Sequence, residues 1–287
     1  MTNSANVQAS IFQRGGIAGA TVLLYILIGI AAPLVAPASP DYQGDLRTAK
    51  FLKPLASGSS GRAGANFFIF GTDHLARDVF SRLLYGIRLS IIVAAAAMAF
   101  SVILGSIVGF VAGITGGWAD ALLMRTTDLF LAMPTLFLII ALVAFFGNST
   151  PLLVTVLAAT GWMGTARLVR GEVLLLRERE FIHAARLLGR SNVQIIRAHM
   201  VPNVMPVIVA ASVLQLGNVI LAEAALSFIG IGIQPPIPSL GNMIGESMAY
   251  IGSAWWIGIF PGVALSGLVV AVNLLGDKLQ HAFGGRG

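Results

Sequence analysis

The sequence predicts an all-α integral membrane protein with six transmembrane helices. Of its 287 residues, 56% are hydrophobic and only 10% are charged, whereas a soluble domain carries about 25% charged residues. The mean hydropathy is +0.86. Several charge-free stretches reach the roughly 20 apolar residues that a helix needs to cross a bilayer. This composition excludes a soluble globular enzyme.

The first four spans follow from apolar runs and the turns between them. We expect the first at 17–37 and the second at 89–114. The apolar run at 17–37 is longer than the roughly 7–15 residues of a secretory signal core, so we interpret it as a retained helix. A longer charge-free stretch is divided by a turn-forming cluster at 147–151, which predicts two helices, at 121–146 and 152–170.

The last two spans are expected at 203–229 and 251–276. The fifth ends near Gly230 because Pro235, Pro236 and Pro238 follow it, and consecutive prolines cannot continue a helix. A charged segment, 172–202, separates the fourth and fifth spans.

The arginines of segment 172–202 set the predicted orientation. Positively charged loops stay in the cytoplasm, and this segment carries Arg177, Arg179, Arg186, Arg190 and Arg197. Counting spans from it places both termini in the cytoplasm and residues 38–88 outside. The outer segment is itself basic, which conflicts with the rule, although the rule is weaker for longer loops. The net charge of +6 is therefore assigned to membrane topology and not to nucleic-acid binding.

Catalytic and metal-binding patterns are not found in the sequence. It has no cysteine, so thiolate metal sites and cysteine nucleophiles are excluded. Lys50, Lys53 and Lys278 do not follow glycine, so there is no Walker A loop, and the four histidines form no zinc motif. We expect no catalytic, metal or cofactor site in this chain.

Two features inside the membrane are candidates for gating or packing. Glu223 is predicted to make a structural or gating hydrogen bond near the outer end of the fifth span, in preference to an ion-coupling role. Gly105, Gly109, Gly113 and Gly117 recur every four residues. Such a stripe permits close helix approach, either within this chain or against a second membrane subunit.

The sequence predicts that segment 172–202 forms a helix, a glycine turn and a second helix. Ala184, Leu187 and Leu188 share one face of the first helix, and Gly189 suits a left-handed C′ position. Ser191 and Gln194 have capping-box spacing for the second helix. The small apolar face favours docking into a groove on a soluble partner over lying on lipid.

Several motifs resemble the dipeptide, oligopeptide and nickel permease family of binding-protein-dependent ABC importers. Residues 181–189 with Val201, Pro202 and Asn203 resemble the EAA loop of these permeases. Residues 70–78, 116–120, 221–230, 234–236, 255–256 and 273–277 resemble further family motifs, and the likeness covers about 11–280. The chain departs from the family pattern at His183, usually Glu, at Val201, usually Leu, and at Ala76, usually Gly.

The resemblance implies a type I ABC importer transmembrane domain at 86–280, with a coupling loop at 172–202, preceded by a cytoplasmic tail, first helix and extracytoplasmic segment at 1–85. It implies the second, C-type, of two different permease subunits in a bacterial cytoplasmic (inner) membrane. The implied partners are a homologous permease, two ATPase subunits that bind ATP and magnesium, and an extracytoplasmic solute-binding protein. Peptides are the implied cargo, although relatives of this kind also carry nickel, glutathione, opines, sugars or chelates.

The resemblance also implies roles for two sets of residues in this chain. The implied ATPase-coupling residues are Glu180, Phe181, His183, Ala184, Ala185, Arg186, Leu188 and Gly189. The candidate gating or structural residues are Asp73, Arg77, Asp78, Asp128 and Glu223. The alternatives are an ion-coupled secondary transporter, which needs ionisable residues at mid-membrane, and a membrane enzyme, which needs a polar constellation at one depth.

Overall fold

The computed structural model describes residues 2–59 and 65–284 and is mostly helical. The long helices are α1 (Thr2–Val35), α2 (Val79–Thr115), α3 (Gly117–Ala132), α4 (Thr135–Phe146), α5 (Thr150–Arg177), α8 (Val201–Phe228) and α10 (Trp256–Gly284). Short helices are α6 (Glu180–Leu187), α7 (Asn192–Ile195) and α9 (Leu240–Ser247), and a π-helical turn (Ile196–Met200) joins α7 to α8. Strands β1 (Ala56–Ser59) and β2 (Ala65–Phe68) form an antiparallel hairpin.

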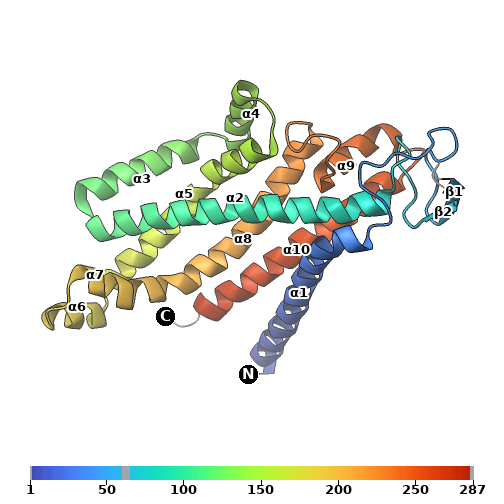
Figure 1. Cartoon of the computed structure of the whole chain (residues 1–287). Helices are drawn as coiled ribbons and strands as arrows, with labels where there is room; N and C mark the ends of the chain where they lie inside the picture. Colours follow the sequence, from blue (N-terminus) through green and yellow to red (C-terminus); the bar gives the residue numbers. More distant parts are fainter. Residues whose placement is uncertain (1, 60–64, 285–287) are drawn as a thin grey trace.

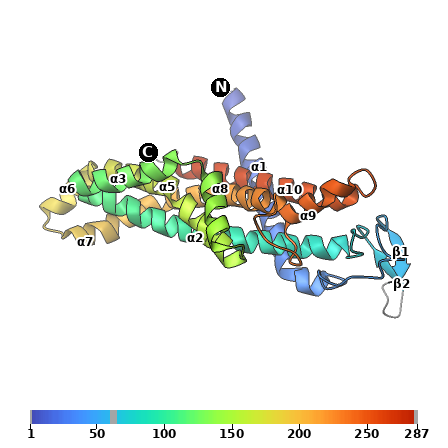
Figure 2. The ribbon, with the colours of Figure 1, turned by 90° about the horizontal axis from the view of Figure 1, so that it is seen from above.

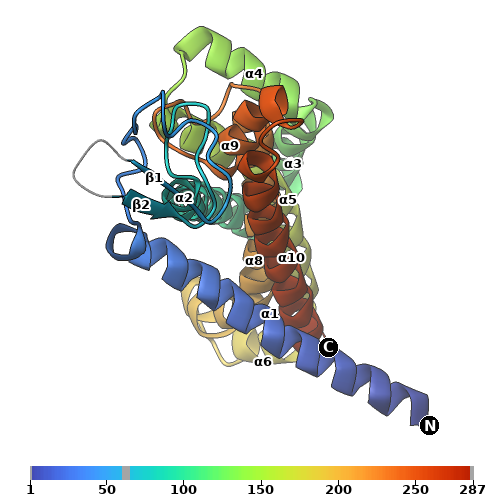
Figure 3. The ribbon, with the colours of Figure 1, turned by 90° about the vertical axis from the view of Figure 1, so that its right-hand side faces the viewer.

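The helices form an elongated bundle with two distinct ends (Figure 1). α6, α7 and the last turns of α10 lie at one end, and the β1–β2 hairpin and α9 lie near the other, as Figure 2 also shows. Viewed from the hairpin end, α1 and α4 lie on opposite sides of the bundle (Figure 3). Within the described residues, five helices are long and apolar enough to cross a membrane, and the number is six when the bent pair α3–α4 is counted as one span.

The third expected span is not the single straight helix predicted at 121–146. α3 and α4 meet at a bend of 84°. Pro134 disfavours helical geometry at the residue before it, and Met133 has the extended angles φ −85 and ψ 129. The rule that ended the fifth span at its prolines also explains this break.

Other boundaries shift without changing the order of elements. α2 begins at Val79, ten residues before the expected 89, because the Asp78 side chain caps it. α5 continues to Arg177 and α10 to Gly284, beyond the expected ends. α8 ends at Phe228, as expected from the prolines that follow. The hairpin and α9 were not predicted.

The glycine stripe packs within the chain. An added Cβ at Gly109 would lie 2.5 Å from the carbonyl oxygen of Ala166, and one at Gly113 would lie 2.7 Å from the Val173 side chain. Gly105 meets the same helix, α5, at Trp162. Three of the four glycines therefore let the backbone of α2 pack directly against α5. Gly117 is not part of this contact, because it opens α3 with φ +56 and its Cβ position is free.

Candidate functional site

The loop between α5 and α8 has the predicted helix, turn, helix form. Gly189 has φ +77 and donates to the carbonyl oxygen of Arg186 at 3.0 Å, while Arg190 donates to that of Ala185 at 3.2 Å. These two bonds form a Schellman motif. Ser191 and Gln194 form the predicted reciprocal capping box. Local sequence therefore fixes the path of the chain at this tip.

One face of the loop is anchored and the other is free. Ile182 is 0% exposed and Ala185 is 6% exposed, and both belong to a buried cluster with Ile195 at the end of the bundle. Leu187 and Leu188 are 88% and 82% exposed. Of the sequence-predicted coupling residues, only Ala185 faces the anchor; the exposed ones are Glu180, Phe181, His183, Ala184, Arg186, Leu188 and Gly189.

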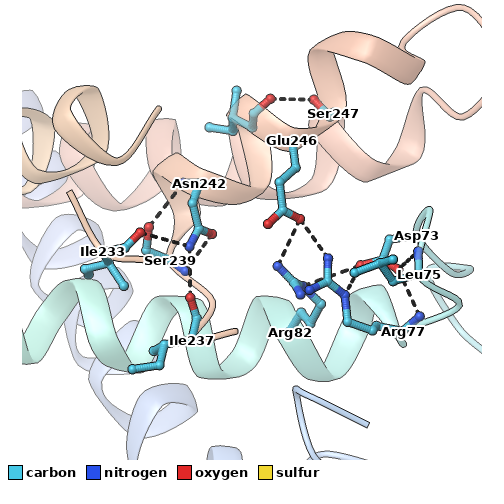
Figure 4. Close-up of polar contacts among 11 residues, drawn as sticks. Asp73, Leu75, Arg77, Arg82, Ile233, Ile237, Ser239, Asn242, Glu246 and Ser247 are labelled. Atoms are coloured by element: carbon cyan, nitrogen blue, oxygen red, sulfur yellow. Dashed lines mark hydrogen bonds and ion pairs between the residues drawn. The ribbon is translucent and has the colours of Figure 1, made fainter. Parts of the chain in front are cut away.

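Two predicted residues, Asp73 and Arg77, belong to a buried charge network at the opposite end (Figure 4). Arg77 binds Asp73 at 2.6 Å and Glu246 at 2.8 Å. Arg82 binds Glu246 at 3.2 Å and lies 3.7 Å from Asp73. The four side chains are only 2–19% exposed. Two guanidiniums thus balance two carboxylates and tie the start of α2 to α9.

Sequence reasoning did not single out Arg82 or Glu246. Glu246 is the only charged residue between Glu223 and Asp277. A lone acid in so long an apolar stretch is a signal for a buried ion pair. Its partners could not be named, because Arg77 and Arg82 lie more than 160 residues away in the chain.

His74 stands beside this network. Its ring stacks on Tyr250 with centroids 5.2 Å apart, and burial lowers the pKa of its imidazole below the ordinary 6.5. Ligand atoms of Asp73, His74 and Glu246 lie within 4.8 Å of one another. Because both carboxylates already pair with guanidiniums, this set lacks the net negative charge that favours a divalent cation.

The turn before α2 holds Ala76 in a backbone conformation that favours glycine. Ala76 has φ +56, the left-handed region that favours glycine, and it is 2% exposed. Two residues later, Asp78 caps α2 by accepting from the backbone and hydroxyl of Ser81 at 2.8 and 2.6 Å. Burial raises the pKa of Asp78, and these hydrogen bonds oppose the rise. The role of Asp78 is therefore structural: it caps the start of α2.

Glu223 is fully buried and hydrogen-bonded. It accepts from Ser90 on α2 at 2.9 Å and from Ser227 at 2.7 Å. Ser227 in turn accepts from the backbone of Ile233 at 3.0 Å. The carboxyl group thus joins α2, the end of α8 and the loop beyond it, as expected of a structural hydrogen bond.

Polar pairs fasten α3 to α5 nearer the loop end. Asp128 pairs with Arg167 at 2.5 Å, with both side chains more than half exposed. Asp120 binds Arg170 through two bonds of 2.5 and 2.6 Å. The sequence analysis named Asp128 but not the Asp120 pair. The exposed Asp128–Arg167 pair contributes little to stability. The Asp120–Arg170 pair is partly buried and makes two bonds, so it holds α3 against α5 more firmly.

Known proteins resemble this chain in sequence along most of its length. Residues 102–286 match the family described as binding-protein-dependent transport system inner membrane component. The dipeptide transport system permease protein DppC of Alkalihalophilus pseudofirmus is 38% identical, over 90% of this chain and 81% of its own. The di/tripeptide transport system permease protein DppC of Pseudomonas aeruginosa is 34% identical, over 96% and 89%. The oligopeptide transport system permease protein OppC of Mycobacterium bovis is 36% identical, over 94% and 91%.

The fold also matches a solved transporter. A chain from the inward-facing MetNI methionine ABC transporter superposes with a TM-score of 0.59 at 24% identity, covering 71% of this chain and 97% of that one. The arrangement of helices is thus that of a type I ABC importer transmembrane domain. The family match and the similar permeases show that this multi-pass membrane chain belongs to the family of binding-protein-dependent transport system inner membrane components.

Proposed function

We propose that this chain is the second, C-type permease subunit of an ATP-driven importer that moves peptides into the cytoplasm by alternating access. Its partners in this proposal are a homologous permease, two ATPase subunits that hold ATP and magnesium, and an extracytoplasmic binding protein. The names of the similar permeases support the peptide cargo. Residues 86–280 would form the transport domain, and 1–85 the tail, first helix and outer segment.

The observation that carries the proposal is the tip of the α6–α7 loop. Leu187 and Leu188 are almost fully exposed on a helix that is otherwise anchored by Ile182 and Ala185. Burying a leucine in a partner's groove contributes roughly 1.5–3 kcal/mol. An anchored helix with an apolar tip can transmit a rigid-body movement of the ATPases into α5 and α8.

The first test is capture of the tagged chain with its partners from solubilised native membranes. We expect two ATPase subunits and a homologous permease, with ATPase activity stimulated by the loaded binding protein. A chain that purifies alone and supports gradient-driven uptake would contradict the proposal and favour an ion-coupled secondary transporter.

The second test separates docking from folding. Leu188→Glu adds a charge at an exposed position, so the chain should fold normally while its affinity for the ATPases falls about 10- to 100-fold. Leu46→Glu is the matched control, because Leu46 is 50% exposed in the outer segment. Equal ATPase capture by both variants would count against the loop as the docking site.

A third test concerns the turn. Gly189→Val places a β-branched residue at φ +77, where only glycine, asparagine and aspartate are readily accommodated. Nothing lies within 4 Å of the added Cβ, so the effect is on backbone conformation alone. We expect Gly189→Val to uncouple ATP hydrolysis from transport and Gly189→Asn to retain coupling. Transport by the valine variant at the wild-type rate would contradict the coupling role.

Orientation is testable because the chain has no cysteine. In the chain produced without the ATPase subunits, a single cysteine at Leu188 should react with a membrane-impermeant maleimide only after permeabilisation of the inner membrane. A single cysteine at Leu46 should react without it. The reverse pattern would place the termini outside.

A further inference from the structure

A cleft opens between α4, α5 and α8 inside the membrane-spanning part of the chain. Its volume is about 380 Å³. Thr135 and Ile139 of α4 cover one side, and Gly164 and Asn218 lie on the facing walls of α5 and α8. None of the lining residues, all within the described ranges, is charged. The 84° bend between α3 and α4 is what carries α4 across this cleft.

Two amide side chains, Gln215 and Asn218, line the cleft, and they differ in their hydrogen bonding. Gln215 accepts from Thr165 at 3.0 Å and donates to Ser101 at 2.5 Å and to the carbonyl oxygen of Gly161 at 3.0 Å. Its carboxamide is therefore committed to joining α2, α5 and α8. The side chain of Asn218 is exposed and forms no hydrogen bond with any part of the chain that the structure describes.

An unpaired carboxamide facing lipid is costly, because hydrocarbon offers no hydrogen-bond partner. Asn218 lies within the apolar helix α8, ten residues before its end at Phe228, and the neighbouring Gly217 packs against Asn273 of α10. In the assembled transporter, Asn218 therefore needs a polar neighbour, which is water, a polar ligand or a polar group of the partner permease. A carboxamide offers one donor and one acceptor side by side, which matches the N–H and C=O of a peptide backbone.

We propose that the cleft between α4, α5 and α8 is an intramembrane site for the peptide cargo, in which Asn218 hydrogen-bonds the peptide backbone. The proposal rests on the proposed function and adds the contact made during passage. Backbone recognition by an uncharged wall would make passage indifferent to the cargo's side chains. Asn218 acts here as a binding residue, whereas Gln215 positions the helices.

The test uses single cysteines in the naturally cysteine-free chain, assembled with its partners in lipid nanodiscs. The probes are Asn218→Cys and Gly164→Cys; at Gly164 the added Cβ meets nothing within 4 Å. The control is Val270→Cys, which is 56% exposed on α10 within about one turn of Asn273. We expect both probes to react with a charged maleimide at least tenfold faster than the control, and millimolar trialanine to slow them.

The outcomes separate this site from the proposed function. Probes as slow as Val270→Cys would mean that lipid or the partner permease fills the cleft, and would overturn the site. Reactive probes that trialanine does not protect, in a complex whose wild-type form imports trialanine, would also overturn it. If the wild-type complex imports no peptide at all, the proposed function is refuted, and the assignment of the cleft as a peptide site is refuted with it.

A functional variant provides a second readout. Asn218→Leu should raise the KM for trialanine import about tenfold, equivalent to about 1.4 kcal/mol, while Gly164→Cys in the same background still reacts with maleimide. Asn218→Gln keeps the carboxamide and should recover part of the loss. An unchanged KM in Asn218→Leu would contradict the proposed contact.

Discussion

Replacing Arg77 with methionine removes one of two guanidiniums that balance two carboxylates at the hairpin end of the bundle. The variant keeps Asp73 and Glu246 with Arg82 as their only cation. Breaking a buried pair by removing one partner costs about 3–5 kcal/mol. Because Glu246 is 19% exposed, water can hydrate part of the excess charge, so we expect the lower end, about 3 kcal/mol.

A double variant tests whether charge balance is the cause. Arg77→Met with Glu246→Met leaves Asp73 and Arg82, which already lie 3.7 Å apart. One cation then faces one anion, so the double variant should be more stable than Arg77→Met alone by on the order of 1 kcal/mol. Additive single effects would mean that the four groups do not act as one network.

The assay is thermal unfolding of the purified complex in detergent, followed by tryptophan fluorescence. A loss of about 3 kcal/mol corresponds to a midpoint lowered by roughly 6–12 °C in domains of comparable size. Arg47→Met is the matched control, because Arg47 is an exposed arginine of the segment between α1 and α2 and should change the midpoint little. An unchanged midpoint for Arg77→Met would refute the reasoning.

Three further predictions concern packing, backbone and protonation. Gly109→Val should destabilise the α2–α5 contact by about 1–3 kcal/mol, whereas Gly171→Ala, with nothing within 4 Å of its Cβ, should not; equal midpoints would contradict the close approach. Ala76→Gly should stabilise the chain by up to about 1 kcal/mol because it relieves φ +56, and a lowered midpoint would show that the buried methyl group matters more. Burial lowers the pKa of His74, so below pH 6.5 the unfolded chain binds more protons than the folded chain, and stability decreases as the pH is lowered toward the folded-state pKa. His74→Gln should flatten this dependence of stability on pH. An unaltered dependence would assign it to other groups.

The sequence was most informative where structure is local. Gly189 and Ser191 predicted their own turn and cap because both motifs depend on residues within one helical turn. The span count was recoverable because lipid demands long apolar helices. The bend at Pro134 follows from the same proline rule that ended the fifth span and could have been predicted.

What the sequence could not predict depends on distant partners. Arg82 and Glu246 are 164 positions apart, and only the tertiary fold brings α9 back to α2. Asn218 and Gln215 are both carboxamide residues in the same apolar helix, so the sequence alone does not distinguish their roles. Their different roles depend on Ser101, Thr165 and Gly161, which engage one amide and leave the other free.

α2 connects the two ends of the molecule and fixes how movement at one reaches the other. At the hairpin end, Arg82 of α2 is bonded to Glu246 of α9. At the loop end, Arg177 of α5 donates to the last carbonyl groups of α2, at Gly113 and Ile114. Between these points, the glycines of α2 pack directly against α5, and this close packing prevents the two helices from sliding past each other. α2 and α5 should therefore move as one body when a partner displaces α6, and the cleft beside α5 changes shape only through α4 and α8.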